Sequence, residues 1–326
     1  MNKDLFLGID TSNYKTSVAI VNGQGDIIKN YSQLLKVEKG ERGLRQSTAL
    51  FQHVNKLPLI FEAALSDKGI RGSIKAIGVS TRPRPINDSY MPVFKVGESF
   101  AKVAASSLGV PIFYFSHQEG HVEAIKFFTP HKDTKEIVCF HFSGGTTEAI
   151  LTGKKKFDIV GGTKDISYGQ VLDRIGVSLG MDFPSGQEMD KIALQYAQRT
   201  HGNNFFTPIK VNEGFLNLSG IETQGQRIIK GNNNIEKIVY DLFITLSESI
   251  IKMINQINQK TNINNYIFAG GVSSSVFIRN YLKENLNSTI NIYFGQPALS
   301  SDNAVGVALL GRKEYGNKTC NGYATK

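Results

Sequence analysis

Two histidines separated by three residues, His117 and His121, have the types and spacing that metal chemistry requires. Residues four apart lie on the same face of a helix, so both imidazoles can point at one ion. Imidazole binds zinc and iron well, but a metal site needs at least one further ligand. The spacing alone leaves two interpretations open: half of a metal site, or two polar residues on an exposed helix.

The residues between the histidines argue against a metallopeptidase. In HExxH enzymes a glutamate directly follows the first histidine, whereas this chain has Gln118 at that position. Glu119 comes one residue later, about 200° around a helix from His117, where its carboxylate would point away from the ion. A peptidase built on this pair would lack its general base.

Two stretches of the chain share one pattern of strands and turns. FLGIDTSNYKTSVAIVNGQGDIIKN and VCFHFSGGTTEAILTGKKKFDIVGG each predict an apolar strand, a small-residue turn and two further strands. Each stretch is followed by helical patterns that alternate with single strands. The repeat predicts two α/β domains built on one plan.

The segments after each predicted hairpin indicate the remaining elements. Residues 47–69 predict a helix with Pro58 as a kink, and its apolar face consists of Leu50, Val54, Leu57, Phe61 and Leu65. Further helices are predicted at 94–108, 166–180, 187–199, 234–258, 273–285 and 302–313, and strands at 74–80, 110–116 and 265–270. We expect the last helix to pack back across the domain boundary.

The composition excludes several classes of protein. With 326 residues and 40% hydrophobic content, the chain is large enough for two domains, and no run of about 18 apolar residues indicates a membrane span. The opening residues do not resemble a signal peptide, so we expect a cytoplasmic protein. Cys139 and Cys320 form no CxxC pair, which argues against a disulfide framework or a thiolate zinc site. The net charge of +9 suits a polyanionic partner such as RNA without requiring one.

Six motifs in register resemble the TsaD family, threonylcarbamoyl transferases once described as glycoprotein endopeptidases. The motifs are LGIDTSNYKTSVAIV, HQEGH, FSGGTTE, GQVLDRIGVSLGMDFPSGQEMD, FAGGVSSSVFIRNYL and SSDNAVG. The resemblance and the doubled strand plan imply an α/β actin-like ATPase (ASKHA) fold, with two ribonuclease-H-like domains and a nucleotide cleft between them. The implied divisions are residues 1–130, residues 131–300, and a C-terminal helix at 301–326 that packs back on the first domain.

The same resemblance implies the residues of a metal site. His117, His121 and Asp302 would be ligands, and His141 occupies a position from which archaeal members of the family approach the ion with a tyrosine. His141 could also be a strand residue without a role. Neutral imidazoles and a carboxylate with open positions would suit one divalent ion, iron or zinc, acting as a Lewis acid.

The resemblance also implies contacts to an adenine nucleotide or an acyl-adenylate. The backbone N–H groups around the SGG turn would face the phosphate or carbamoyl end, and two carboxylates would lie near the ribose. The implied nucleotide residues are Ser143, Gly144, Gly145, Thr146, Asp173, Gly186, Asp190, Gly270, Gly271 and Ser275. Asp10, Lys15 and Ser143 are the candidates for catalytic roles, although Asp10 could simply cap the end of its strand.

The chain departs from the family pattern at positions that would face the substrate. Tyr14 and Lys15 stand where the family commonly has Asp-Glu, and Thr146 and Ser275 replace longer polar residues. A proline-rich loop, STRPRPINDSYMP at 80–92, replaces the family's glycine-rich loop. Its Arg82 and Arg84 could hold a phosphate or carboxylate, or be ordinary solvent-exposed loop residues. The departures indicate a divergent paralogue.

Three functions remain open from the sequence. The first is metal-dependent transfer of a threonylcarbamoyl or related carbamoyl group from an adenylate to an amine, which in the family proper belongs to the tRNA adenosine next to the anticodon. The second is a carbamoyltransferase with a small-molecule acceptor, and the third is a non-catalytic nucleotide-binding scaffold. The implied partners are a TsaB-like homologous protein or a second copy of the chain, contacted through the first domain, and possibly tRNA.

Overall fold

The computed structural model describes residues 4–320 except 13, 38–43, 87, 133, 135, 154–155, 199–201, 296–298 and 300–303. The chain divides into two compact units, each with its own sheet. The first unit comprises the described residues of Met1–Lys132 and Asp302–Lys326, and the second comprises those of Asp133–Ser301. The first unit is therefore built from both ends of the chain.

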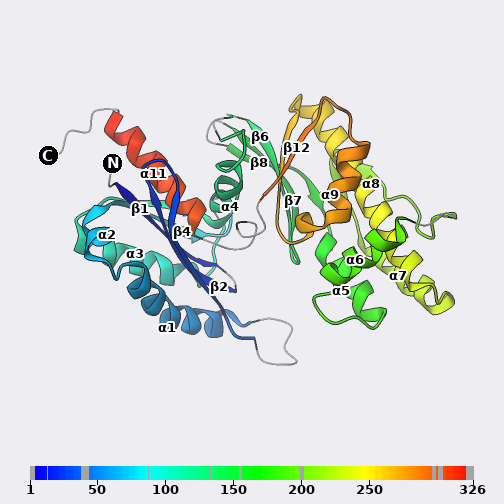
Figure 1. The fold of residues 1–326 in the computed structure, drawn as a ribbon, viewed down its shortest axis with the longest axis horizontal. Helices are drawn as coiled ribbons and strands as arrows, with labels where there is room; N and C mark the ends of the chain where they lie inside the picture. The colour runs from blue at the N-terminus through cyan, green and yellow to red at the C-terminus, as the bar shows by residue number, and fades with distance from the viewer. Residues whose placement is uncertain are drawn as a thin grey trace. The chain divides into compact units, whose positions relative to one another are not determined.

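The first unit contains a five-stranded sheet with the order β3-β2-β1-β4-β5 (Figure 1). Its first three strands form antiparallel hairpins, whereas β4 and β5 run parallel to β1. The bounds are β1 Leu5–Ser12, β2 Lys15–Asn22, β3 Ile27–Leu34, β4 Ile74–Arg82 and β5 Ile112–Ser116. This arrangement confirms the three-strand plan predicted for the start of the chain.

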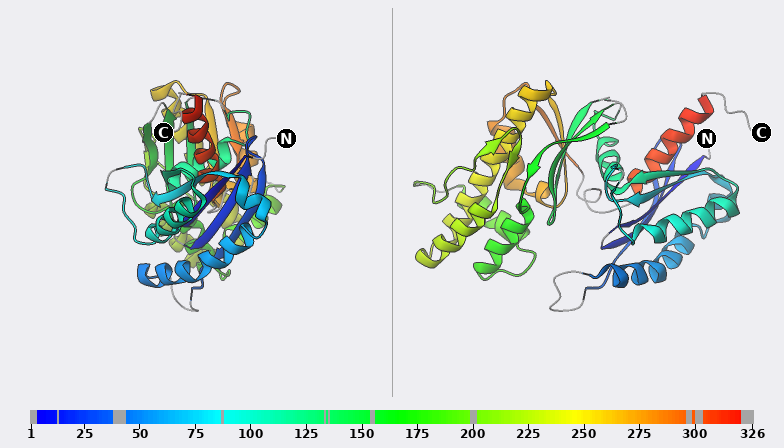
Figure 2. Two further views of the ribbon diagram at one scale, coloured as in Figure 1. Left: turned by 90° about the vertical axis from the view of Figure 1, so that its left-hand side faces the viewer. Right: turned by 180° about the vertical axis from the view of Figure 1, so that it is seen from behind.

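Helices that pack on this sheet come from distant parts of the chain. They are α1 Gln46–Ala64, α2 Lys68–Ser73, α3 Phe94–Leu108, α4 His117–Lys126 and α11 Val305–Cys320. Apolar side chains of α1 and α3 pack with those of β1, β2 and β4 to form the core of this unit. Figure 2 shows α11, in red, alongside the dark blue strand β1, and α11 also packs on β4.

Two glycines let α11 approach the sheet. Gly8 and Gly78 are direct partners in the β1–β4 ladder. A Cβ atom on Gly8 would overlap with the backbone oxygen of Ala304, and one on Gly78 with that of Val307. The backbone of the C-terminal helix thus rests directly on the two central strands, which only residues without a side chain permit.

The second unit contains a seven-stranded sheet with the order β12-β11-β6-β7-β8-β10-β9. It repeats the antiparallel three-strand plan in β6, β7 and β8, and β11 runs parallel to β6, as β12 does to β11. The bounds are β6 Ile137–Phe142, β7 Thr147–Gly153, β8 Lys156–Thr163, β9 Val211–Asn212, β10 Phe215–Leu216, β11 Asn265–Ala269 and β12 Asn291–Phe294.

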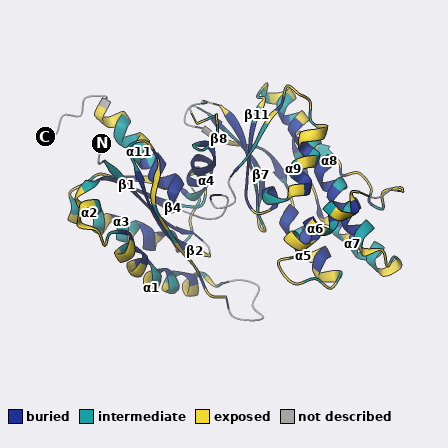
Figure 3. Cartoon of the chain, in the orientation of Figure 1, coloured by how far each residue is buried: buried dark blue, intermediate teal, exposed yellow. Residues whose placement is uncertain are grey.

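The helices of the second unit enclose the larger of the two cores. They are α5 Tyr168–Ser178, α6 Gly186–Tyr196, α7 Ser219–Gly231, α8 Ile235–Thr261, the 3₁₀ turn η1 Val272–Ser274 and α9 Val276–Asn285. One face of α8 is buried along its length, which Figure 3 shows in dark blue. Cys139 lies 1% exposed in this unit, and burial raises the pKa of its thiol to about 12, in keeping with a residue that only fills space.

The helix patterns were partly wrong in detail. α1 buries Ala49, His53, Leu57, Ile60 and Ala64, so its inner face is turned relative to the predicted one, and Val54 is 40% exposed. The assigned helix continues through Pro58. α7 was not predicted, because its glycines at 220, 225 and 231 hide a weak apolar pattern. No helix in the described part of the chain is long and apolar enough to span a bilayer.

Candidate functional site

The two histidines lie on the first turns of α4, as their spacing predicted. Ser116 is the N-cap of this helix, and its side chain accepts a hydrogen bond from the backbone N–H of Glu119 at 3.2 Å. Glu119 accepts in return from the backbone N–H of Ser116 at 2.6 Å. This reciprocal capping box fixes the start of the helix, and it commits Glu119 to structure rather than to proton transfer.

The imidazoles of His117 and His121 converge. Their Nε2 atoms are 2.9 Å apart, and the ring centroids are 4.3 Å apart. His121 is 5% exposed, so the pair is not a polar patch on an outer helix face. The two histidines are therefore not simply polar residues on an exposed helix face, because their rings meet where little solvent reaches them.

A buried carboxylate contacts Nδ1 of His117, the ring nitrogen that does not face His121. Asp10 on β1 is 1% exposed, and its Oδ1 lies 3.0 Å from Nδ1 of His117. The hydroxyl of Ser12 donates to Asp10 at 2.5 Å, and the hydroxyl of Ser80 on β4 also donates to it. Burial alone would raise the pKa of Asp10, but the charge of His117 and these hydrogen bonds together hold the pKa below its ordinary value.

This network determines where the proton of His117 resides. An ionised Asp10 accepts from Nδ1–H of His117, so in the neutral form of the ring the lone pair is on Nε2, the atom that faces His121. A carboxylate behind a histidine is the usual support of a metal ligand, since it fixes the tautomer and the ring orientation. The described residues thus fit an ion held by two Nε2 atoms, and this fit rests on the donor chemistry.

The third predicted ligand cannot be compared with the pair. Asp302 lies outside the described residues. His141 lies on β6 in the second unit, in register with Ala269 of β11 and Glu148 of β7. Within the described part of the chain, no group of three or more His, Cys, Asp or Glu residues is arranged to hold a metal.

Two basic residues lie on strand ends near the Asp10 network. Lys15 begins β2 and is in register with Ser12, whose hydroxyl bonds to Asp10. Arg82 ends β4 and is in register with Ser116, the N-cap of α4. The loop that follows β4 also touches this helix, because Pro83 accepts from the backbone N–H of Gln118 at 3.1 Å.

The two arginines at the end of β4 and in the loop after it differ in their exposure to solvent. Arg82 is half-buried at the strand end, whereas Arg84 is exposed to solvent. The backbone N–H of Arg84 donates to the hydroxyl of Ser89 at 2.9 Å, which closes the loop on itself. Of the two predicted anion-holding groups, Arg82 is therefore the one tied by strand register to the helix of the histidines.

A third histidine of the first unit, His53, was not among the residues predicted to have a role. His53 on α1 is fully buried, and its Nδ1 lies 2.8 Å from the hydroxyl of Thr16 on β2. Burial lowers the pKa of His53 to about 4, although the charge of Asp10 opposes this shift. The signal available from the sequence was the polar residue at position 53 between apolar positions 50 and 57, but the predicted face assigned Val54 instead.

The SGG turn of the second unit connects β6 to β7. The hydroxyl of Ser143 accepts from the backbone N–H of Thr146 at 3.0 Å and of Gly145 at 3.3 Å. Gly144 and Gly145 are exposed, and nothing lies within 4 Å of the position of a Cβ atom on either. The turn is thus open to an incoming group, but its own serine already engages two of the predicted phosphate donors.

Two segments that are distant in the sequence lie against this turn. A Cβ atom on Gly270, which has φ +91°, would overlap with the backbone oxygen of Phe142, so the end of β11 touches the start of the turn. The N-cap of α5, Ser167, donates to the backbone oxygen of Gly144 at 2.8 Å. Gly271 is exposed, and Gly186 is half-buried. The structure therefore places the end of β11 and the start of α5 beside the SGG turn.

Two predicted ribose contacts also serve the fold. Asp173 on α5 is half-buried, which raises the pKa of its carboxyl, and it accepts from the backbone N–H of Ser185 at 2.9 Å. Asp190 on α6 is 8% exposed and accepts from the backbone N–H of Val276 at 2.9 Å and from the hydroxyl of Ser275 at 2.5 Å. Asp190 thereby caps α9, and a ribose contact for it stays a prediction.

Comparison with known proteins supports the motif resemblance over nearly the whole chain. A family model described as "TsaD: tRNA N6-adenosine threonylcarbamoyltransferase" matches residues 27–309. A protein of this name from Thermosipho africanus is 30% identical over 321 residues, covering 95% of this chain and 94% of the relative. One from Neorickettsia sennetsu is 28% identical over 319 residues, covering 94% and 93%.

The fold is also found in solved structures. The structure described as full-length HypF in the phosphate- and nucleotide-bound form superposes with a TM-score of 0.61 at 12% identity, covering 99% of this chain and 57% of that protein. At this identity the likeness speaks for the fold alone. The expected α/β actin-like ATPase fold is confirmed.

Proposed function

Because this chain belongs to the TsaD family of tRNA N6-adenosine threonylcarbamoyltransferases, we propose that it transfers a threonylcarbamoyl group from an adenylate to a tRNA adenosine next to the anticodon. In this reaction the exocyclic amine attacks the carbamoyl carbonyl, the bond from that carbon to the phosphate oxygen breaks to release adenosine monophosphate, and the amine loses a proton to solvent. The observation that carries the proposal is the line of contacts from Asp10 through His117 to His121.

We assign the metal site of this reaction to His117, His121 and Asp302, with His141 as a further donor. The first two residues already direct their Nε2 atoms toward one another, and Gly120 and Gly306 bring α4 against α11, the helix that begins three residues after Asp302. When bound there, an iron or zinc ion would polarise the carbamoyl carbonyl as a Lewis acid. Asp10 acts as a positioning residue, because its contacts are with His117 and hydroxyl groups.

The second unit would hold the nucleotide. The exposed turn at Gly144 and Gly145 lets a phosphate approach the backbone, and the half-buried carboxylate of Asp173 stands ready for a hydroxyl group. Lys15 and Arg82 supply positive charge on the strand ends next to Asp10, where the carboxylate of a threonyl group or the departing phosphate could be neutralised. The backbone N–H groups of the turn would then stabilise charge that develops on transfer.

The partner of the chain would bind through the first unit. Phe51, Val54 and Leu59 of α1 are 66%, 40% and 60% exposed, a large apolar area for a free helix face. We propose that a TsaB-like homologous protein, or a second copy of this chain, covers this face. The reaction would take place in the cytoplasm, where tRNA is found.

A small-molecule acceptor is the second candidate, favoured by one observation. Lys15 and Arg82 place cations at strand ends where the family commonly has acids and a glycine-rich loop. Such a change would suit an acceptor or donor that carries a carboxylate or phosphate of its own. The amine would then belong to a metabolite rather than to RNA.

Mass spectrometry of tRNA nucleosides separates the two candidates. We expect tRNA from a deletion strain to lose threonylcarbamoyl-adenosine, and the wild-type gene to restore it. Genes carrying His117→Asn or His121→Asn should fail to restore the nucleoside, whereas His131→Asn, a change outside the pair, should succeed. An unchanged level in the deletion strain would exclude tRNA modification as the main role and leave the small-molecule acceptor.

A further inference from the structure

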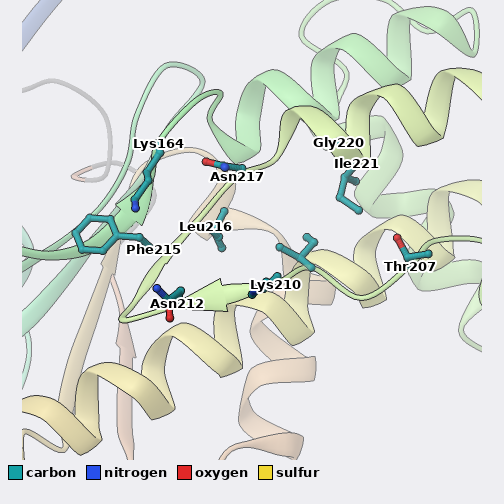
Figure 4. A pocket seen from close by; sticks show the side chains of 10 residues that line it. Lys164, Thr207, Lys210, Asn212, Phe215, Leu216, Asn217, Gly220 and Ile221 are labelled. Atoms are coloured by element: carbon teal, nitrogen blue, oxygen red, sulfur yellow. The ribbon is translucent and has the colours of Figure 1, made fainter.

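A pocket of about 350 Å³ lies in the second unit, and none of its lining residues belongs to the histidine pair or the glycine turn (Figure 4). It is framed by the end of β8, the short β9–β10 hairpin and the first turn of α7. Its floor is apolar, because Ile209, Leu216 and Ile221 are each 5% exposed or less. None of the motifs discussed above explains it.

The rim of this pocket is polar and positively charged. Lys164, Lys210, Asn212 and Asn217 line it and are exposed. Within the described part of the chain, neither lysine forms an ion pair and neither asparagine side chain has a hydrogen-bond partner. Four groups that can bind an anion or the edge of a base are therefore free for a ligand.

The carboxylate of Asp165, the residue that follows Lys164, forms hydrogen bonds at the start of α7. Asp165 accepts from the backbone N–H groups of Leu218 at 2.8 Å and Ser219 at 3.0 Å, at the start of α7. Partial burial raises the pKa of Asp165, but the hydrogen bonds from Ser219 and Leu218 outweigh it and lower the pKa. The carboxylate of Asp165 is therefore engaged at the start of α7, and it does not neutralise the ammonium of Lys164.

An aromatic ring lies beside this ammonium. Nζ of Lys164 is 5.7 Å from the ring centroid of Phe215. The ring is half-buried and lines the same pocket. A cation next to an aromatic face can contact the phosphate and the base of one nucleotide together, the combination that proteins use for single-stranded nucleic acid.

The pocket is connected to the glycine turn by a short segment. Lys164 is three residues before Ser167, whose hydroxyl donates to the backbone oxygen of Gly144 at 2.8 Å. Three residues span at most about 10 Å. The loop is also pinned, since Thr163 donates through its hydroxyl to the backbone oxygen of Ile166 at 2.7 Å. A ligand in the pocket would therefore lie close to a ligand at the turn.

We infer that this pocket binds single-stranded RNA flanking the nucleotide that is modified. Lys164 and Lys210 contact phosphodiester groups, and Phe215 with the two asparagines contacts a base. The inference rests on the proposed function, because it takes tRNA as the substrate. It adds a separate anchoring site for the RNA, which neither the histidine pair nor the glycine turn provides.

The test uses the full-length chain and a fluorescent tRNA that lacks the modification, with binding followed by anisotropy at several salt concentrations. For the double variant Lys164→Gln, Lys210→Gln, the slope of log K against log salt should become shallower by about 1.4, which is about 0.7 for each lost phosphate contact. Affinity at 0.1 M salt should fall roughly ten- to thirtyfold. Phe215→Leu, which keeps apolar volume, should weaken binding on the order of tenfold.

The matched control is the double variant Lys230→Gln, Lys260→Gln. Both lysines are exposed in the same unit and do not line the pocket, so the control removes the same charge. Its affinity and salt slope should stay close to those of the wild type. An equal loss in both double variants would overturn the inference, since general charge would then explain binding.

The remaining outcomes distinguish the inference from the proposed function. If the pocket variants bind tRNA as tightly as the wild type does, RNA binding by the pocket is overturned. The proposed tRNA modification is not affected by that result. Failure of the wild type itself to bind tRNA would overturn both. Pocket variants that keep RNA affinity but lose an acidic protein partner would overturn the RNA assignment in favour of protein docking. Urea unfolding midpoints show that each variant is folded.

Discussion

A single buried carboxylate determines which ring nitrogen of His117 carries the proton. Asp10 is ionised because three donors surround it in the interior, and it takes the Nδ1–H group. Without that contact the ring could rotate or exchange its proton between the two nitrogens. The proposed role of His117 as a metal ligand therefore depends on Asp10, which contacts its other ring nitrogen.

Asp10→Asn tests this dependence. The amide cannot supply the same charge, so we expect folded protein whose affinity for zinc or iron falls about 10- to 100-fold. Metal affinity is measured by competition with a chromophoric chelator. Asp158→Asn, an exposed change on β8, should bind metal like the wild type. Equal affinity in Asp10→Asn would show that His117 needs no support.

His53 makes stability depend on pH. Its pKa is about 4 in the folded protein and about 6.5 in the unfolded chain. Between these values the unfolded chain binds more protons, so the free energy of unfolding falls as the pH is lowered, by roughly 3 kcal/mol in total. Urea unfolding at pH 7, 5.5 and 4 measures this. His53→Asn, which can still reach Thr16, should show a smaller fall, and an unchanged fall would assign the effect to other groups.

The residues of the site were predictable only where the signal is local. The spacing of His117 and His121 is visible in the sequence, and so is the Ser-x-x-Glu signature at Ser116 and Glu119, which identifies a capping box. The contact between Asp10 and His117 joins positions 107 apart. It exists because β1, β4 and β5 are parallel neighbours, so that α4 begins after β5 at the edge where β1 ends, and no short-range pattern encodes that pairing.

At the scale of elements, variants of Glu119 test whether this residue caps the start of α4 or acts as a catalytic base. Glu119→Gln keeps an acceptor for the backbone N–H of Ser116, so we expect near-wild-type stability and transferase activity. Glu119→Ala loses that contact and should cost about 1 kcal/mol in urea unfolding. A peptidase that used Glu119 as its base would lose its activity in both variants. Such a parallel loss would contradict the structural assignment.

The crossing of α4 and α11 depends on two facing glycines. A Cβ atom on Gly306 would overlap with the backbone oxygen of Gly120, and backbone cannot move aside cheaply. Gly306→Ala should therefore reduce the free energy of unfolding by about 1–3 kcal/mol. Gly316→Ala on the same helix meets open space and should stabilise by about 0.5–1 kcal/mol. Equal effects of the two changes in urea unfolding would contradict close packing at this crossing.

The elements themselves were mostly predictable, for identifiable reasons. The strands of both hairpins alternate or run apolar between turns of small and polar residues, and α3 and β4 have clear boundaries in the sequence. The inner face of α1 was misjudged because Val54 is apolar and His53 is polar, yet the sheet accepts His53 through Thr16. α7 carries too few apolar residues to stand out, and its buried Gly225 is invisible to a count of hydrophobic side chains.

For the whole molecule, the two units differ in how the chain supplies them. The second unit is continuous and has its own core of buried side chains, whereas the sheet of the first is covered in part by α11 from the far end of the sequence. We expect residues 133–301 to fold alone, with a cooperative urea transition. Residues 1–132 should not, because Gly8 and Gly78 would leave the backbone of two strands uncovered.

A fusion of residues 1–132 to residues 304–326 through a flexible linker is the matching control. It restores α11 to the strands and should recover a cooperative transition, measured by far-ultraviolet circular dichroism. Cooperative folding of residues 1–132 without the helix would contradict the role given to α11.

The same discontinuity sets an order of events during synthesis. At about 5–20 residues per second, the ribosome needs roughly 10–35 seconds to proceed from Lys132 to Ala304. Over that interval the sheet of the nascent amino-terminal segment stays uncovered, while the second unit is still being synthesised. The proposed metal site would therefore be complete only once translation is nearly finished, and prematurely terminated chains would lack it.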